Sequence, residues 1–181
     1  MALSDEIPCL VQHFYSAYMD PDVTRPLLKE NMVKAYTHYK KYLQLLSWQV
    51  GEDKDKDKNP PRKWMLKCPV HLFYPKEIAT AFPDAKLIWT HRHPISAVPS
   101  MCSLLKSFHK LYYEEEGRDD AALGKTLLRV SEDLLTQAPK DIKDCGLPCA
   151  HITYNRLLSE PVVVVKEIYA QFGWSFSKEY V

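Results

Sequence analysis

The alternation of hydrophobic and polar positions along the chain predicts mostly helices, with a few short strands between them. Where apolar residues recur three and four positions apart, as at Met32, Ala35 and Tyr39, we expect an α-helix with one buried side. Short apolar runs without this period are typical of buried strands. The pattern predicts helices over 4–19, 26–48, 73–82, 94–112, 119–137 and 161–172. It predicts strands at "KWMLK" (63–67), "AKLIWT" (85–90) and "AHITY" (150–154).

The order of these elements predicts a single α/β domain over residues 1–181. Strands that alternate with helices form parallel sheets with helices packed on their faces. Pro161 suits the first position of the last helix, and Gly173 suits the position just after its end. The segment "GEDKDKDKNPPRK" (51–63) combines alternating charges with two prolines, so we expect an exposed loop there. The fold class expected is therefore α/β, with a short parallel sheet flanked by helices.

The charge balance bears on which partners the protein binds, and the cysteine content bears on the cellular compartment. With 24 basic and 23 acidic residues the formal net charge is +1, which gives no reason to expect nucleic acid as a partner. No apolar stretch approaches the ~20 residues of a transmembrane helix, and "MALSDEIPCL" lacks the regions of a signal peptide. The five cysteines are odd in number and scattered, which is typical of reduced thiols. We therefore expect a cytoplasmic protein without a transmembrane segment.

Two groups of potential metal ligands are better explained without a metal ion. Cys145, Cys149 and His151 lie close together in the sequence, but no second pair completes a four-ligand zinc site. His91 and His93 stand on either side of an arginine, and this arrangement suits an anion better than a metal ion. No bound metal is expected.

The segment "THRHPISAVPS" (90–100) joins a predicted strand to a predicted helix and carries the groups of an anion site. Ligands of open parallel sheets bind at the carboxyl ends of the strands. Pro94 suits the first helical position, and a helix N-terminus offers unpaired N–H groups and a positive dipole end. Arg92 adds a planar cation suited to phosphate, and Ser100 adds a hydroxyl donor. Pro99 removes a backbone donor, and the distortion expected there would bring the Ser100 hydroxyl toward the strand end. The junction therefore favours a clamp for a phosphate monoester.

The simpler explanation of Arg92 is a surface arginine paired with a carboxylate. The preceding predicted strand favours the clamp, because Lys67 stands at its end and His71 follows four residues later. If the two strands are parallel neighbours, Lys67, His71 and Arg92 converge at one edge of the sheet. There His71 could act as a general base and Lys67 could neutralise a leaving phosphate. Taken alone, His71 would also suit a loop that caps the next helix.

Two long stretches of the chain resemble the sulfotransferase family. The first is "WMLKCPVHLFYPKEIATAFPDAKLIWTHRHPISAVPSMCSL" (64–104), and the second is "ITYNRLLSEPVVVVKEIYAQFG" (152–173). The similarity is to the branch with the pattern Leu-Lys-x-Pro-x-His-Leu, then Phe-Pro-Asp-Ala, an apolar strand, Arg-x-Pro and Pro-Ser. The individual motifs are short, but their order and spacing together are specific.

This resemblance implies a P-loop-NTPase-like three-layer fold and a nucleotide co-substrate, 3′-phosphoadenosine 5′-phosphosulfate (PAPS). Sulfotransferases move its sulfuryl group to a hydroxyl or amine, and we expect a small-molecule or carbohydrate acceptor here. The resemblance places Arg92 and Ser100 at the 3′-phosphate and Tyr154 at the adenine. It places Lys67 at the leaving phosphate and His71 at the acceptor. Without the resemblance, Tyr154 is a core aromatic residue at a strand end.

The sequence departs from the family at its first cofactor element. That element is a strand followed by a Pro-x-Ser-Gly-Thr-Thr type loop, and no glycine precedes Gly51 in this chain. We therefore expect a partial fold that lacks the first strand and loop, incomplete at the N-terminus and at the C-terminus. Cytosolic sulfotransferases also carry a histidine two residues after the lysine, where this chain has Pro69. Two hypotheses stay open: a sulfotransferase, or a non-catalytic fragment, isoform or pseudoenzyme that keeps only the 3′-phosphate-binding half.

Overall fold

The structure, a computed structural model, describes residues 32–51, 64–112 and 119–176. The helix predicted over 4–19 and the first part of the helix predicted over 26–48 lie outside these residues. No helix within the described ranges is both long enough and apolar enough to cross a membrane. The elements in chain order are α3 (Val33–Gly51), η1 (Pro69–Phe73), α4 (Pro75–Ala81), β1 (Leu87–His91), α5 (Pro94–Tyr112), α6 (Asp120–Cys145), β2 (Cys149–Thr153), α7 (Tyr154–Ser159) and α8 (Pro161–Gln171).

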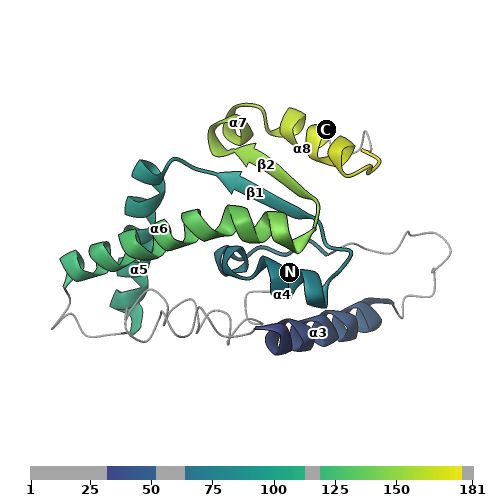
Figure 1. The fold of residues 1–181 in the computed structure, drawn as a ribbon, viewed down its shortest axis with the longest axis horizontal. Helices are drawn as coiled ribbons and strands as arrows, with labels where there is room; N and C mark the ends of the chain where they lie inside the picture. Colours follow the sequence, from purple (N-terminus) through teal and green to yellow (C-terminus); the bar gives the residue numbers. More distant parts are fainter. Residues whose placement is uncertain (1–31, 52–63, 113–118, 177–181) are drawn as a thin grey trace.

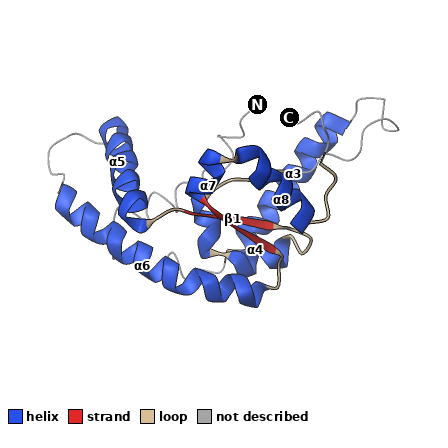
Figure 2. Ribbon diagram, turned by 90° about the horizontal axis from the view of Figure 1, so that it is seen from above, coloured by secondary structure: helices blue, strands red, loops and turns tan. Residues whose placement is uncertain are grey.

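The two strands form a parallel sheet at the centre of the molecule, as Figures 1 and 2 show. Trp89 is paired with His151, and His91 is paired with Thr153. Successive side chains of a strand point to opposite faces, and paired positions of neighbouring strands share a face. The odd-numbered residues of both strands therefore lie on one face, and Ile88, Ala150 and Ile152 lie on the other. The predicted α/β class and the parallel sheet are confirmed.

Helices cover the sheet on both sides, which gives the layered arrangement visible in Figure 1. On one side Ala150 and Ile152 of β2 pack with Val164 and Ile168 of α8 in a buried cluster. On the other side lie α6, α4 and α3 in succession. A second cluster joins α3 to η1 and α4, with Tyr36 almost completely buried, and Leu87 of β1 packs against it. The two clusters hold the strands between helical layers.

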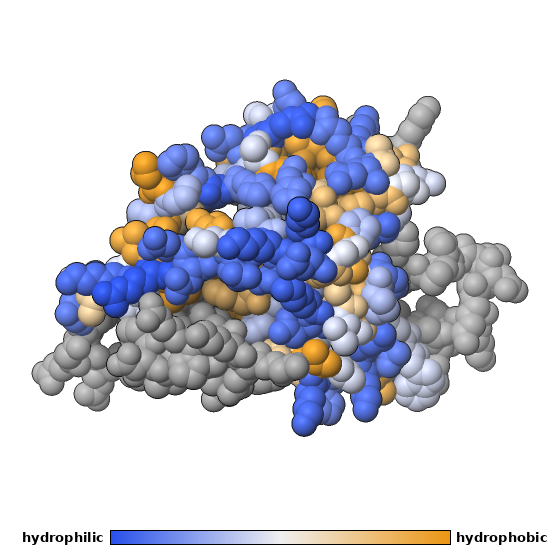
Figure 3. All heavy atoms as spheres, viewed as in Figure 1, coloured by the Kyte–Doolittle hydropathy of each residue, from blue (hydrophilic) through white to orange (hydrophobic). Residues whose placement is uncertain are grey.

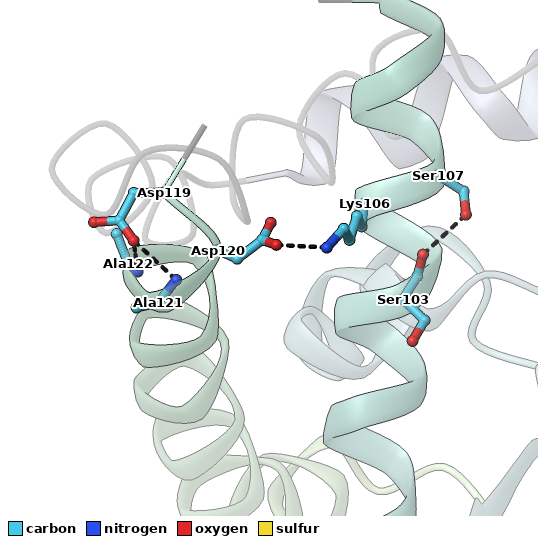
Figure 4. A network of polar contacts seen from close by, with 7 residues as sticks. All are labelled: Ser103, Lys106, Ser107, Asp119, Asp120, Ala121 and Ala122. Atoms are coloured by element: carbon cyan, nitrogen blue, oxygen red, sulfur yellow. Dashed lines mark hydrogen bonds and ion pairs between the residues drawn. The ribbon is translucent and has the colours of Figure 1, made fainter. Parts of the chain in front are cut away.

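Helix α5 and the first half of α6 extend beyond the sheet (Figure 2), and the two helices pack against each other. Leu105 of α5 and Leu127 of α6 are both completely buried between them. Asp119 caps the start of α6, because its carboxylate accepts from the N–H groups of Ala121 and Ala122 at 2.9 and 3.0 Å (Figure 4). The neighbouring Asp120 pairs with Lys106 of α5, so the start of α6 is also tied to that helix.

The outer side of α6 is hydrophilic, as its amphipathic sequence requires. Figure 3 shows this helix as a band of hydrophilic side chains across the front of the molecule. Lys125, Arg129, Glu132, Asp133 and Lys140 are among its exposed residues. The chain therefore buries one side of α6 and leaves the other in water.

The prediction of elements from the sequence needs three corrections. The prediction of a strand at "KWMLK" is wrong, because residues 64–68 form no strand. Trp64 and Met65 there are exposed, and the Trp64 indole N–H donates to the Ser47 hydroxyl of α3 at 2.9 Å. An apolar run forms a strand only where another strand pairs with it, and here Trp64 contacts α3 instead.

The other two corrections concern the end of one helix and a helix that was not predicted. The helix predicted over 119–137 continues through Pro139 to Cys145 and ends at Gly146, whose φ of 73° is the left-handed conformation that glycine favours. Residues 154–159 form the short helix α7, which the sequence pattern did not indicate. By contrast, α8 starts at Pro161 and ends just before Gly173, which has a φ of 66°, as expected.

Candidate nucleotide site

The predicted strand–turn–helix junction is present, and His93 caps its helix. The N–H of Ile95 donates to His93 Nδ1 at 3.3 Å, and the N–H groups of Ser96 and Ala97 donate to the His93 carbonyl oxygen at 2.9 Å each. Pro94 has no N–H. The first turn of α5 therefore has its N–H groups paired with His93, and the prediction of unpaired N–H groups is wrong here. The positive end of the helix dipole remains at the junction.

Arg92, Ser100 and Tyr154 lie together at the carboxyl ends of the two strands. Arg92 Nη1 donates to the Ser100 hydroxyl oxygen over a long 3.4 Å. The Arg92 guanidinium carbon lies 5.1 Å from the centre of the Tyr154 ring. Helix α5 runs unbroken through Pro99, so Ser100 reaches Arg92 from a continuous helix. Tertiary structure thus brings together the three residues that the resemblance assigns to a nucleotide.

The cluster presents a cation and a hydroxyl group at the surface. Arg92 and Ser100 are exposed, and Tyr154 is half-buried. Among the residues that the structure describes, no carboxylate pairs with Arg92. A guanidinium fork beside a hydroxyl donor matches the oxygens of a phosphate group. The donor set therefore fits a phosphate monoester, and the adjacent ring of Tyr154 offers a flat surface to a base.

The helix that carries Tyr154 is anchored to the body of the protein. Arg156 makes two hydrogen bonds to the Glu167 carboxylate of α8, at 2.6 and 2.5 Å. Paired hydrogen bonds of this kind fix direction as well as distance. Tyr154, at the first position of α7, therefore starts a helix whose place relative to α8 is set.

His71 lies in η1, where it contacts the buried core of α3. The Tyr36 hydroxyl and His71 Nδ1 are 2.9 Å apart. Burial lowers the pKa of His71 to about 4, so the imidazole is neutral at neutral pH. Burial raises the pKa of Tyr36, so its hydroxyl keeps its proton and can either donate to Nδ1 or accept from it. No local pattern in the sequence indicates this partner, which lies 35 residues away.

Lys67 is exposed and precedes η1. The expected convergence of Lys67 with Arg92 requires that each follow a strand, and residues 64–68 form none. That argument from strand ends therefore does not hold for Lys67. Its role at the leaving phosphate rests on the resemblance.

A pair of histidines on one face of the sheet escapes prediction from the sequence. His91 Nε2 and His151 Nδ1 lie 2.9 Å apart, across β1 and β2. In the sequence, His91 groups with its neighbour His93, and His151 groups with Cys145 and Cys149. Only the register of the sheet shows that the two histidines are partners, since sixty residues separate them.

A hollow lies at the amino end of β2, away from the cluster of Arg92, Ser100 and Tyr154 at the carboxyl ends of the strands. It is an open hollow of about 590 Å³ between the end of α6 and the start of β2. None of the residues expected at the nucleotide line it. In the described ranges, no group of three or more histidine, cysteine or acidic residues is placed to hold a metal ion. The hollow is lined by Pro139, Ile142, Lys143, Gly146, Leu147, Pro148, Cys149 and His151.

Comparison with known proteins bears on the fold and the family. The crystal structure of sulfotransferase STF9 from Mycobacterium avium superposes with a TM-score of 0.75 over 90% of this chain, at 24% sequence identity. The chain spans 40% of the length of that protein. Curated protein sequences give no match of significance. The family model described as the sulfotransferase family matches residues 6–178, nearly the whole chain. A match of this extent shows that the chain belongs to the sulfotransferase family.

Proposed function

We propose that this protein transfers a sulfuryl group from PAPS to a hydroxyl or amine of a small-molecule or carbohydrate acceptor. Membership of the sulfotransferase family supports sulfuryl transfer in general. The observation that supports PAPS as the donor is the cluster of Arg92, Ser100 and Tyr154, with an exposed guanidinium at its centre.

In this proposal the cluster binds the nucleotide half of the donor. Arg92 and the Ser100 hydroxyl donate hydrogen bonds to the 3′-phosphate, and the dipole of α5 adds to the attraction. One face of the Tyr154 ring contacts the adenine, and the other face contacts the Arg92 guanidinium. These residues position the donor and take no part in bond breaking.

In the chemical step, the acceptor oxygen or nitrogen forms a bond to sulfur as the bond from sulfur to the bridging phosphate oxygen breaks. The electron pair of that bond leaves with adenosine 3′,5′-bisphosphate, and the Lys67 ammonium offsets the developing charge. His71 takes the proton of the acceptor. Nε2 can accept this proton only if the hydrogen of the neutral imidazole is on Nδ1. The Nδ1–H group then donates a hydrogen bond to the Tyr36 oxygen, 2.9 Å away. Tyr36 would then select the tautomer that can act as a base.

The cysteines support a reducing compartment for this reaction. Cys68, Cys102, Cys145 and Cys149, the four cysteines within the described ranges, are free thiols. Burial raises the pKa of the Cys68 and Cys149 thiols, which keeps them protonated and unreactive. We propose a cytoplasmic location on this basis.

Calorimetric titration of the full chain with adenosine 3′,5′-bisphosphate tests the site. We expect the unsubstituted chain to bind the nucleotide. Arg92→Ala should lower the affinity about tenfold or more, because hydrogen bonds to charged groups contribute about 1.5–3 kcal/mol each. Arg129→Ala removes another exposed arginine, on α6, and should bind normally. A folded chain that does not bind the nucleotide would refute the proposed site.

Transfer of labelled sulfate from PAPS to a panel of alcohols, amines and sugars then tests the reaction. Binding without transfer would support the non-catalytic hypothesis. Transfer that is lost in His71→Gln while nucleotide binding is kept would support the role of His71 as the base.

A further inference from the structure

The His91–His151 pair occupies a distinctive place in the sheet. The two residues are diagonal neighbours on one face, since His91 is paired with Thr153 and His151 with Trp89. Their ring planes lie within 18° of each other, and Nε2 of His91 is 2.9 Å from Nδ1 of His151. The Trp89 ring packs against both, with its centre 4.5 Å from that of His91 and 5.7 Å from that of His151. Both rings are therefore held in one arrangement by a hydrogen bond and an aromatic neighbour.

His91 stands immediately before Arg92 of the nucleotide cluster, and His151 lies two residues before the end of β2. Arg92 follows His91 directly, and Tyr154 follows Thr153, the register partner of His91. The described part of the sheet has two strands, and a two-stranded sheet is only marginally stable on its own. A side-chain hydrogen bond between the strands at this point limits their relative movement. Any change in spacing there would shift the Arg92 guanidinium against the Tyr154 ring.

The chemistry of the pair suits this structural use. A hydrogen bond between two neutral imidazoles needs one ring to donate and the other to accept. Burial, and then the neighbouring His151, lower the pKa of His91, so this residue stays neutral near neutral pH. His151 is exposed and borders the hollow beside β2, where Lys143 is the cationic residue in the lining. Neither ring needs to contact the nucleotide in order to affect it.

We propose that His91 and His151 are positioning residues, whose hydrogen bond sets the spacing of Arg92 and Tyr154 and thereby the preference for nucleotides with a 3′-phosphate. This inference rests on the proposed function. It extends the site to two residues on the sheet that act through Arg92 and Tyr154.

The test compares the affinities of the full chain for adenosine 3′,5′-bisphosphate and for adenosine 5′-phosphate, which lacks the 3′-phosphate. His91→Phe and His151→Phe keep a ring and remove the hydrogen bond. We expect each to reduce the affinity ratio of the two nucleotides about three- to tenfold, the range for one lost hydrogen bond. The double variant should lose no more than either single variant, because both remove the same contact.

Conservative variants separate this role from a merely structural one. Gln can place an amide nitrogen near Nε2, and Asn can place an amide group near Nδ1, so His91→Gln and His151→Asn should keep the ratio within about twofold. His38→Phe changes an exposed histidine on α3 and should leave the ratio unchanged. A loss of stability alone would reduce both affinities equally and leave their ratio intact.

Three outcomes would overturn the inference. An unchanged affinity ratio in folded phenylalanine variants would show that the pair does not position the cluster. The proposed function would still stand if the unsubstituted chain binds adenosine 3′,5′-bisphosphate. An unsubstituted chain with no preference for the 3′-phosphate would refute the proposed function itself, and the inference with it. Should a phenylalanine variant not fold, ring-nitrogen NMR of the unsubstituted chain decides. A shared N–H···N bond supports the inference, and two independently solvated rings overturn it.

Discussion

The Arg92 guanidinium carbon lies 5.1 Å from the centre of the Tyr154 ring, so the residue after β1 meets the first residue after β2. The parallel register makes this contact possible, because it ends both strands at the same level of the sheet. A cation–π contact at an exposed site contributes about 0.5–1 kcal/mol of stabilisation. The contact orients the guanidinium toward Ser100 before any ligand arrives.

Substitutions of Tyr154 should separate its ring from its hydroxyl. We expect Tyr154→Phe to bind adenosine 3′,5′-bisphosphate within about twofold of the unsubstituted chain, because the ring face under Arg92 is kept. Tyr154→Ala should weaken binding at least two- to fivefold, through loss of the cation–π contact. Calorimetric titration measures both. Equal losses in the two variants would mean that the hydroxyl, and not the ring, matters.

The stability of the protein should depend on pH through His71. The pKa of His71 is lowered from 6.5 to about 4 by burial, so the unfolded chain takes up this proton at a higher pH than the folded chain. The free energy of unfolding should therefore be undiminished above pH 6.5 and should fall between pH 6.5 and pH 4, by roughly 3 kcal/mol at most. Denaturant titrations at pH 7, 5.5 and 4 measure this fall.

The carboxylates also titrate in that range, so the comparison needs a variant. His71→Gln keeps a polar side chain beside Tyr36 and removes the titrating group. Its loss of stability from pH 7 to pH 4 should be smaller than that of the unsubstituted chain. The same pH dependence in both proteins would contradict the prediction.

The capping of α6 by Asp119 should be measurable in the melting temperature. Asp119→Ala leaves the N–H groups of Ala121 and Ala122 without their acceptor, at a cost of about 1 kcal/mol. For a chain of this length that corresponds to a Tm lower by about 2–4 °C. Asp119→Asn should restore most of the loss, and Asp133→Ala, on the exposed side of the same helix, serves as the control. An unchanged Tm in Asp119→Ala would show that water replaces the cap without cost.

The packing of α5 on α6 should depend strongly on Leu105. This side chain is completely buried, so Leu105→Ala leaves a cavity and should lower the free energy of unfolding by about 2–5 kcal/mol. Leu128→Ala makes the same change at a side chain that is 62% exposed and should cost much less. Denaturant titration compares them. Similar losses in the two variants would mean that the α5–α6 contact adds little to stability.

The sequence by itself determined the class of the fold and most of its helices. Periodic apolar residues predicted α5, α8 and the described part of α3, because a helix with one buried side requires that spacing. Pro161 and Gly173 marked the ends of α8 correctly. The proline ring fixes a backbone angle that suits the start of a helix, and glycine readily adopts the left-handed conformation that follows its end. The order of the motifs around Arg92 also indicated the sulfotransferase family, and the match to the family model confirms it.

Tertiary structure alone decided which side chains meet. A run such as "KWMLK" has the composition of a strand, but a strand forms only where another strand pairs with it, and Trp64 contacts α3 instead. The partners of His71 and His91 lie 35 and 60 residues away, beyond any pattern of local spacing. Register places His91 beside His151, and burial then lowers the pKa of His91. Local spacing fixes which side of each element is buried, and only the packed chain determines which residues from different elements act together.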